Sequence, residues 1–279
     1  MNSVGRYLVQ NGALKKILSS SDPIKKIAQK FVLGKNLEEI LPAVEGWKKD
    51  GFGVILYPIE ADSGDYLKAL KFLSEKEITG SISLRTPLED IDSVTEEAIH
   101  QKVRIEIDMR SPKTVDQTLQ LYSEIKRKHT DSIICLQANL YRTAADIEDL
   151  TAVVPIVRLV KGAFNGAGTY QTKKDADVNF IKLAKRLMDK GIKTYIATHD
   201  QKLINEFIKY TEKRGIEREL FGFQMLYGVR TKLQEELLEN GHEVWKYVAY
   251  GEDWVPYCVN RIFERKENIT FALNAILRG

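Results

Sequence analysis

The chain has 279 residues, 43% hydrophobic and 29% charged, which is typical of a soluble globular protein with a large core. Its net charge of +3 is too balanced to favour nucleic-acid binding, and two cysteines exclude a disulfide framework. The four histidines lack metal-ligand spacing, so no metal site is predicted. Without a signal-peptide pattern or an apolar run of roughly 20 residues, a cytoplasmic protein is expected.

In chain order, residues 1–48 are predicted to form short helices, and short β-rich segments then alternate with helical ones. The predicted strands are 53–58, 79–85, 103–108, 132–137, 156–160, 194–198, 221–225 and 246–250. Between them, apolar residues recur at intervals of three and four, which predicts amphipathic helices such as 63–77, 114–128 and 177–190.

Strand–helix alternation indicates parallel strands, because parallel neighbours need a crossover connection. Eight such units favour a (β/α)8 barrel, whose typical size is ~250 residues. We therefore expect a helical cap over 1–48 and a catalytic barrel over 49–279. A doubly wound open sheet is the alternative, but no glycine fingerprint follows the first strand.

Polar residues gather where the predicted strands end, which is where a barrel of this kind places its active site. Each one alone is typical of a barrel rim, whereas the whole set favours a site for a polar ligand. Two of them are cations that suit a phosphate or an electron-rich ring. The set comprises Asp108, Gln137, Arg158, Lys161, His199, Gln224 and Tyr247.

Further along, Tyr257, Arg261 and Glu264 fall at i, i+4 and i+7, so a helix would present them on one face. An aromatic ring, a guanidinium and a carboxylate on one stripe are compatible with binding an anionic small molecule. They are equally compatible with a solvated helix face.

Six segments in order along the chain resemble the FAD-dependent proline dehydrogenases, in their short single-function bacterial form. The resemblance implies a distorted (β/α)8 barrel with N-terminal helices and a last helix over the barrel mouth. The matching segments are "IDMRS" (107–111), "LQANLYRT" (136–143), "RLVKGAF" (158–164), "ATHD" (197–200), "FQMLYGV" (223–229) and the run from Tyr247 to Asn268.

The resemblance also implies roles for individual residues. Arg158 matches an arginine beside flavin N5, where a fixed positive charge stabilises arriving electron density, and Asp108 joins it as a catalytic residue. The other implied cofactor-binding residues are Met109, Gln137, Lys161, Gly162, Ala163, Thr198, His199, Gln224, Arg261 and Glu264.

The implied substrate pocket is altered. Leu226, Tyr247 and Tyr257, which pack on the proline ring in the family, are kept, but Asn260–Arg261 replaces a pair of arginines that binds the substrate carboxylate. Phe164 replaces a tyrosine. The lysine that the family carries on its second strand has no clear counterpart: this strand offers Ser83 or Arg85, both on one of its faces.

The resemblance implies oxidation of L-proline to 1-pyrroline-5-carboxylate, with a quinone or another acceptor taking the electrons. The incomplete arginine pair leaves open a dehydrogenase for a different cyclic or secondary amine. A flavin-binding protein without turnover is a third reading, although Asp108 and Arg158 argue against it. We expect a cytoplasmic protein, with peripheral contact at the inner face of the membrane as an alternative, and no nucleic-acid partner.

Overall fold

Eight parallel strands close into a barrel in the computed structural model, which describes residues 31–109, 111–162, 164, 166–252, 254 and 257. The strands are β2 (Gly53–Pro58), β3 (Gly80–Arg85), β4 (Arg104–Asp108), β5 (Ile133–Gln137), β6 (Ile156–Val160), β7 (Thr194–Ala197), β8 (Phe221–Leu226) and β9 (Glu243–Tyr250). Each pairs with the next, and β9 pairs with β2 to close the barrel. The predicted (β/α)8 fold is confirmed.

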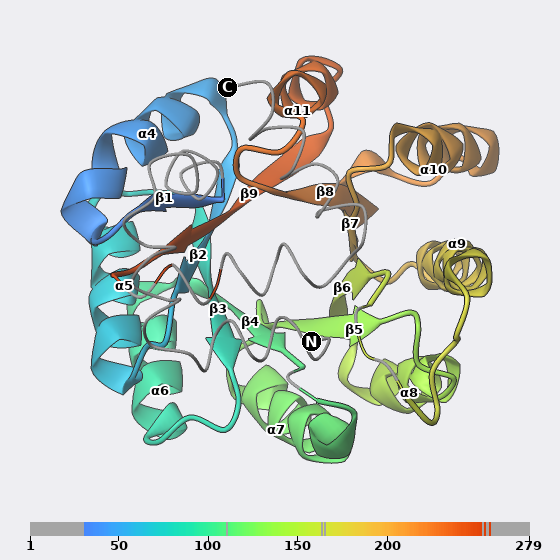
Figure 1. Cartoon of the computed structure of the whole chain (residues 1–279), viewed down its shortest axis with the longest axis horizontal. Helices are drawn as coiled ribbons and strands as arrows, with labels where there is room; N and C mark the ends of the chain where they lie inside the picture. The colour runs from blue at the N-terminus through green and yellow to red at the C-terminus, as the bar shows by residue number, and fades with distance from the viewer. Residues whose placement is uncertain are drawn as a thin grey trace, which may run out of the picture.

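A ring of helices surrounds the barrel (Figure 1). They are α4 (Leu37–Asp50), α5 (Ser63–Glu75), α6 (Ile91–Gln101), α7 (Val115–Lys128), α8 (Thr143–Leu150), α9 (Lys173–Asp189), α10 (Gln201–Arg214) and α11 (Thr231–Glu239). Polar side chains cap the first turns of several of these helices. Asp62 accepts a hydrogen bond from the amide of Asp65 to begin α5, and Thr172 accepts one from Asp175 to begin α9.

Alternation along the strands separates two layers of packing. On β9, Val244 and Val248 pack in the core between strands and helices, whereas Trp245 and Tyr247 belong to a second cluster inside the barrel. Successive strand side chains point to opposite faces, so this pattern is what a two-sided buried sheet requires. The inner cluster includes Tyr57 and Tyr195 from the facing strands.

Polar groups close the amino-terminal end of the barrel. Arg104 donates to the hydroxyl of Tyr195 at 2.9 Å, and Glu243 accepts from both Tyr195 and Trp245, at 2.8 and 2.7 Å. Lys193 also pairs with Glu243. The chemistry that the sequence places at the opposite, carboxyl ends of the strands is therefore separated from this end by packed side chains.

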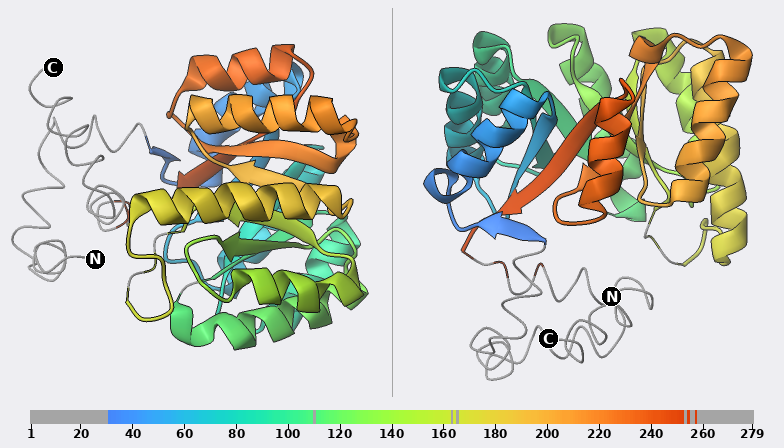
Figure 2. Two further views of the ribbon diagram at one scale, coloured as in Figure 1. Left: turned by 90° about the vertical axis from the view of Figure 1, so that its right-hand side faces the viewer. Right: turned by 90° about the horizontal axis from the view of Figure 1, so that it is seen from above.

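The start of the described chain adds a short strand, β1 (Val32–Gly34), which pairs with β9 at Ala249 and Tyr250, beyond the last β8 partner. Helix α4 then takes a place in the ring between α5 and α11, as Figures 1 and 2 show, and crosses the expected boundary at 48/49. Residues 1–30 and the predicted last helix lie outside the described residues, so the cap and that helix stay predictions. Of the helices described, none is both long and apolar enough to cross a membrane.

Candidate active site

A buried ion pair joins β4 and β6, the two strands on either side of β5, near the carboxyl-terminal mouth of the barrel. Arg158 Nη1 on β6 donates to Asp108 Oδ1, the last residue of β4, over 3.0 Å. The Arg158 side chain is 10% exposed and the Asp108 side chain 17%, so both are largely withdrawn from water. The structure thus brings together the two residues predicted to be catalytic.

The second oxygen of Asp108 is held by two hydroxyl groups. Ser83 on β3 donates to Oδ2 over 2.9 Å, and the Tyr247 hydroxyl on β9 lies 3.3 Å from the same oxygen. The hydroxyls of Ser83 and Tyr247 are themselves 2.9 Å apart. Ser83, one of the two candidate counterparts of the family lysine, is therefore a neutral partner of Asp108.

A second carboxylate lies one layer deeper on the same strand. Glu106 is fully buried, and its Oε1 accepts from Ser81 and from Gln224 Nε2, each over 2.9 Å. Its Oε2 lies 3.9 Å from Arg158 Nη1. The Arg158 guanidinium therefore lies between two carboxylates. Of the two, Asp108 accepts a hydrogen bond from it and Glu106 does not.

Burial and charge act together on these groups. Burial disfavours the charged guanidinium of Arg158, but Asp108 and the other neighbours outweigh it and raise the pKa of Arg158, which stays charged. Burial, reinforced by Asp108, raises the pKa of Tyr247, so its hydroxyl stays protonated. Burial also raises the pKa of Glu106 to about 7, against the opposing charge of Arg158.

Stacked aromatic rings form one wall of the barrel mouth. Tyr57 and Tyr247 stack with ring centroids 5.8 Å apart, and Tyr257 lies 5.6 Å from Tyr57. Arg158 lies 4.5 Å above the Tyr247 ring and Arg85 lies 4.3 Å above the Tyr57 ring. Two guanidinium groups thus lie against one aromatic stack.

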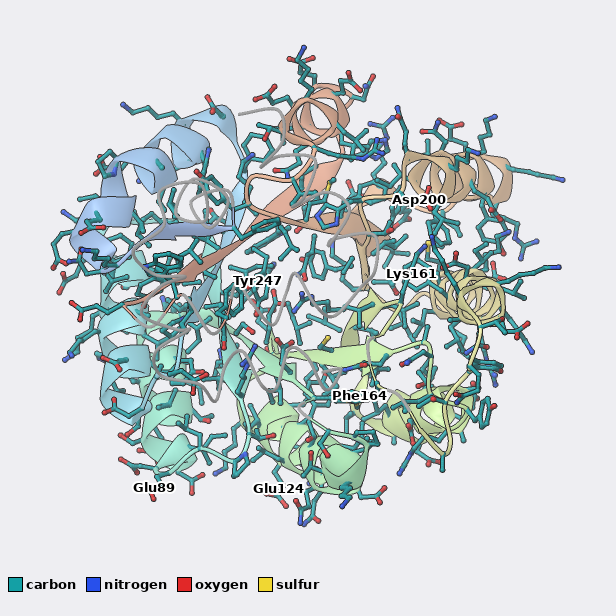
Figure 3. The ribbon with its side chains drawn as sticks, in the orientation of Figure 1. Glu89, Glu124, Lys161, Phe164, Asp200 and Tyr247 are labelled. Carbon is teal, nitrogen blue, oxygen red and sulfur yellow. The ribbon has the colours of Figure 1, made fainter. Side chains whose placement is uncertain are left out.

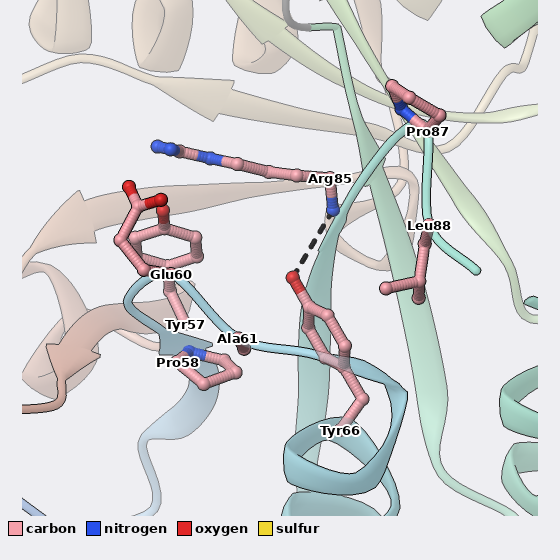
Figure 4. Close-up of a pocket in the computed structure, with 8 residues that line it drawn as sticks. All are labelled: Tyr57, Pro58, Glu60, Ala61, Tyr66, Arg85, Pro87 and Leu88. Carbon is pink, nitrogen blue, oxygen red and sulfur yellow. Dashed lines mark hydrogen bonds between the residues drawn. The ribbon is translucent and has the colours of Figure 1, made fainter. Parts of the chain in front are cut away.

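Arg85 also lines a cavity of about 120 Å³ where β2 and β3 end. Figure 4 shows its side chain reaching from β3 across the ring of Tyr57, with the Glu60 carboxylate beside it. The backbone amide of Arg85 donates to the hydroxyl of Tyr66, which anchors the end of the strand. The remaining lining residues are Pro58, Ala61, Pro87 and Leu88.

The connection after β6 is built around Lys161 and Gly162. Lys161 pairs with Asp177 of α9 at 2.7 Å and with Asp200, the residue before α10, at 3.7 Å. Figure 3 labels Lys161 and Asp200 on the side of the barrel where α9 and α10 lie. Gly162 has a φ of +99°, and a Cβ there would lie 2.0 Å from Asn139 Oδ1. Only glycine therefore allows this close approach.

Asn139, which packs against Gly162, also contacts Phe164. Its Nδ2 donates to the carbonyl of Phe164 over 2.6 Å, and the half-buried Phe164 ring packs against the core between strands and helices. Phe164 was predicted to bind the substrate, and that role stays a prediction.

The remaining predicted residues occupy the ends of β5, β7 and β8. Gln137 and Thr198 are buried at the rim, and His199 Nε2 accepts from the amide of Leu226 over 2.8 Å, which leaves its other ring nitrogen as the protonated one. Leu226 packs against the cluster inside the barrel. Met109 packs in the core between strands and helices, so its predicted flavin contact stays a prediction.

Four predicted site residues, Ala163, Asn260, Arg261 and Glu264, lie outside the described residues. The sequence reasoning missed several residues of the site, among them Glu106, Ser81, Asn139, Tyr57 and Asp177. Glu106 was detectable, since it stands two residues before Asp108 on one strand and must therefore face the same side. Nothing in the sequence distinguished Ser81 or Asn139 from ordinary rim residues.

Residues 54–273 match the family model described as proline dehydrogenase, which is most of the chain. The chain belongs to the proline dehydrogenase family. Recognition of the family from sequence motifs is thereby confirmed, together with the expectation of an oxidoreductase acting on a CH–NH group.

Two curated relatives illustrate the match to other proline dehydrogenases. The chain is 28% identical to proline dehydrogenase 2 of Bacillus subtilis (strain 168), covering 98% of this chain and 97% of the relative. It is 30% identical to proline dehydrogenase of Deinococcus radiodurans, covering 91% of each.

The fold has solved counterparts in longer proteins. Proline utilization A (PutA) from Bdellovibrio bacteriovorus, inactivated by N-propargylglycine, superposes with a TM-score of 0.79 at 19% identity, over 98% of this chain and 39% of that one. PutA from Bradyrhizobium japonicum gives 0.72 at 17% identity, over 97% and 34%. The single barrel described here thus corresponds to one part of those larger chains.

Proposed function

We propose that the protein is an FAD-dependent dehydrogenase that oxidises L-proline to 1-pyrroline-5-carboxylate. The observation that carries the proposal is the largely buried pair of Arg158, in the middle of β6, and Asp108, the last residue of β4, in a chain of the proline dehydrogenase family. A permanent cation held in a water-poor site is suited to stabilise negative charge that develops in a reaction.

The described residues fit a flavin. Arg158 Nε and Gln224 Oε1 are buried without a hydrogen-bond partner within the described residues, so a donor and an acceptor remain available. Gln137, Lys161, Thr198 and His199 would complete the binding set, and FAD, when bound, would supply the acceptor for a hydride.

The substrate end is proposed to be the aromatic wall and the cavity beside it. Tyr247, Tyr257 and Leu226 offer apolar contact for a saturated ring. Phe164 lies in the connection after β6, where its carbonyl accepts from Asn139. Arg85 supports a carboxylate-binding role, because it lines the cavity at the end of β3 and its charge survives at any physiological pH. This role would offset the loss of one arginine at Asn260.

The described residues have separate roles in the proposed oxidation. Proline must lose a hydride from the carbon beside the nitrogen and a proton from the nitrogen, and the electrons leave to a quinone or another acceptor. Asp108 is held by Ser83 and Tyr247, so its orientation towards Arg158 is fixed before substrate binds. The aromatic wall excludes water from this side of the mouth.

A second candidate is a dehydrogenase for a different cyclic or secondary amine, because Asn260 removes a charge from the pair that binds carboxylate in the family. A flavin-binding protein without turnover is disfavoured by the retained Asp108–Arg158 pair. We also propose a cytoplasmic location, with peripheral membrane contact as the alternative that a quinone acceptor would require.

The test begins with the colour of the purified protein. We expect flavin absorbance near roughly 450 nm, non-covalent release of FAD on denaturation, and bleaching on anaerobic addition of L-proline. Pyrrolidine, which lacks the carboxylate, is the matched comparison. Bleaching by pyrrolidine and not by proline would favour the second candidate, and protein that takes up no FAD would overturn both.

A further inference from the structure

Glu106 is the second carboxylate beside Arg158, and the reaction outlined above gives it no part. It is fully buried inside the barrel, two residues before Asp108 on β4, and it faces Ser81 of β3 and Gln224 of β8. Its Oε2 is 3.9 Å from Arg158 Nη1 and has no hydrogen-bond partner among the described residues.

The charge of this cluster changes when Glu106 takes up or releases a proton. Arg158 stays positive, and Cys135, Tyr195 and Tyr247, which face the cluster from β5, β7 and β9, stay neutral because burial raises the pKa of each. Beside the ion pair of Arg158 and Asp108, a protonated Glu106 adds no charge, whereas an ionised Glu106 adds one negative charge.

Hydrogen bonding in the cluster leaves room for that proton. Among the described residues, both hydrogen bonds to Glu106 end on Oε1, while Oε2 and Gln224 Oε1 are buried acceptors without donors. An ionised carboxylate can only accept, but a protonated one adds a donor. One proton on Glu106 would thus supply a donor where this cluster has unsatisfied acceptors, and Gln224 Oε1 keeps a second lone pair for the flavin.

We propose that Glu106 is a positioning residue that acts through Arg158. By holding or releasing a proton, Glu106 sets the net charge of the cluster around Arg158, which would face the flavin. The inference rests on the proposed function. Burial raises the pKa of Glu106 to about 7, so the two charge states are close in free energy at neutral pH.

The consequence is coupling between electrons and a proton. Negative charge that arrives beside Arg158 favours the protonated form of Glu106, because a like charge nearby disfavours the carboxylate. Reduction of the protein near neutral pH should therefore take up a proton at Glu106 in addition to those taken up by the flavin itself.

The test uses the FAD-loaded protein and Glu106→Gln, which keeps the size of the side chain and an acceptor for Ser81 but cannot titrate. The flavin potential is measured against pH by dye-coupled reduction, without any substrate. We expect the wild-type potential to fall more steeply with pH around neutrality than that of Glu106→Gln, and the variant to have the higher potential at alkaline pH.

A second variant tests the same idea with little change in packing. Ser81→Ala removes a hydrogen bond that favours ionised Glu106, so the steep part of the wild-type profile should move to higher pH. Infrared titration should show a carboxylic acid band that disappears through the same pH range in the wild type and is missing in Glu106→Gln, in flavin-free protein as well.

Equal pH profiles in wild type and Glu106→Gln, with flavin bound in both, would overturn this inference and leave the proposed function standing. The same holds if no titrating carboxyl band distinguishes the two proteins. A protein that binds no flavin would overturn the inference and the proposed function together.

Discussion

Tyr57 and Tyr247 stack with their ring centroids 5.8 Å apart, and each ring carries an arginine on it. Arg158 lies over Tyr247, next to the buried carboxylates, while Arg85 lies over Tyr57, next to the cavity at the ends of β2 and β3. The two cations thus lie on neighbouring rings of one aromatic pair. In the proposed function, Arg158 serves the reacting end of the substrate and Arg85 its carboxylate.

The first prediction concerns Arg85. Arg85→Gln should raise the apparent Kd for proline by about tenfold or more, since one charge-assisted hydrogen bond contributes about 1.5–3 kcal/mol. Binding is measured by flavin perturbation with proline and with a carboxylate-bearing ring analogue. Pyrrolidine should bind the variant and the wild type equally, because it has no carboxylate to lose.

Lys68→Gln, which removes a charge from a side chain that is 73% exposed on α5, is the matched control and should leave proline affinity unchanged. Equal losses for proline and pyrrolidine would show that Arg85 supports the shape of the pocket rather than binding a carboxylate. The prediction would then be wrong.

The second prediction concerns Asn260, which stands where the family has an arginine. If the pocket takes proline, Asn260→Arg should tighten proline binding by about 1–3 kcal/mol, because a bidentate partner for the carboxylate is regained. In the Arg85→Gln background the same change should restore part of the lost affinity. If the pocket serves another amine, the added charge should instead lower activity on that amine; no change in either measurement contradicts the placement of Asn260 at the ligand.

The third prediction is that Arg158→Met slows flavin reduction by roughly a hundredfold or more, the typical effect of removing one preorganised donor. Stopped-flow reduction at saturating substrate measures it. The control is Arg104→Met at the other end of the barrel, where the guanidinium also lies over an aromatic ring, 5.2 Å from that of Trp245. Arg104→Met should lower stability without slowing reduction; similar rates in both variants would contradict the catalytic role of Arg158.

The fourth prediction compares two glycines with similar backbone and different surroundings. Gly162 and Gly166 have φ of +99° and +113°, but a Cβ at 162 would meet Asn139 Oδ1 whereas a Cβ at 166 meets nothing within 4 Å. Gly162→Ala should therefore lower the free energy of unfolding by about 1–3 kcal/mol more than Gly166→Ala. Urea denaturation measures both, and Asn139→Ala should recover part of the difference. Equal effects would mean that backbone strain alone matters at 162.

The strands could be predicted closely from the sequence because each is an apolar run with polar turns on both sides. Predicted 53–58 and 156–160 are the observed β2 and β6. The start of one helix was harder to place. Helix α9 begins at Lys173 and not at 177, since Thr172 caps a polar first turn that carries no apolar period.

Side-chain partners across the barrel could not be predicted from the sequence. Strand alternation places Glu106 and Asp108 on one face, but which of them bonds Arg158 depends on the register of β4 and β6, which pair with β5 and not with each other. Ser83 likewise binds Asp108 only because the barrel curves β3 and β4 towards a common interior. Distances of this kind arise from closure of the whole sheet.

The last prediction concerns pH and the buried lysine of β9. Lys246 Nζ donates to Gln234 of α11 over 2.9 Å and lies 3.7 Å from the ring centroid of Phe52. Burial lowers the pKa of Lys246 to about 8, against the nearby charges of Glu235 and Asp50, whereas an unfolded chain would have a lysine pKa near ~10.4. Between these values the unfolded chain binds more protons than the folded one, so the free energy of unfolding rises with pH.

Lys246→Met keeps the length of the side chain without its charge and should lack this rise. The wild type should therefore gain roughly 1–3 kcal/mol relative to the variant between about pH 7.5 and 10, measured by urea denaturation followed by circular dichroism. Lys71→Met, at an exposed position on α5, is the control and should follow the wild-type profile. Parallel profiles for wild type and Lys246→Met would show that the folded protein holds this lysine at its ordinary pKa.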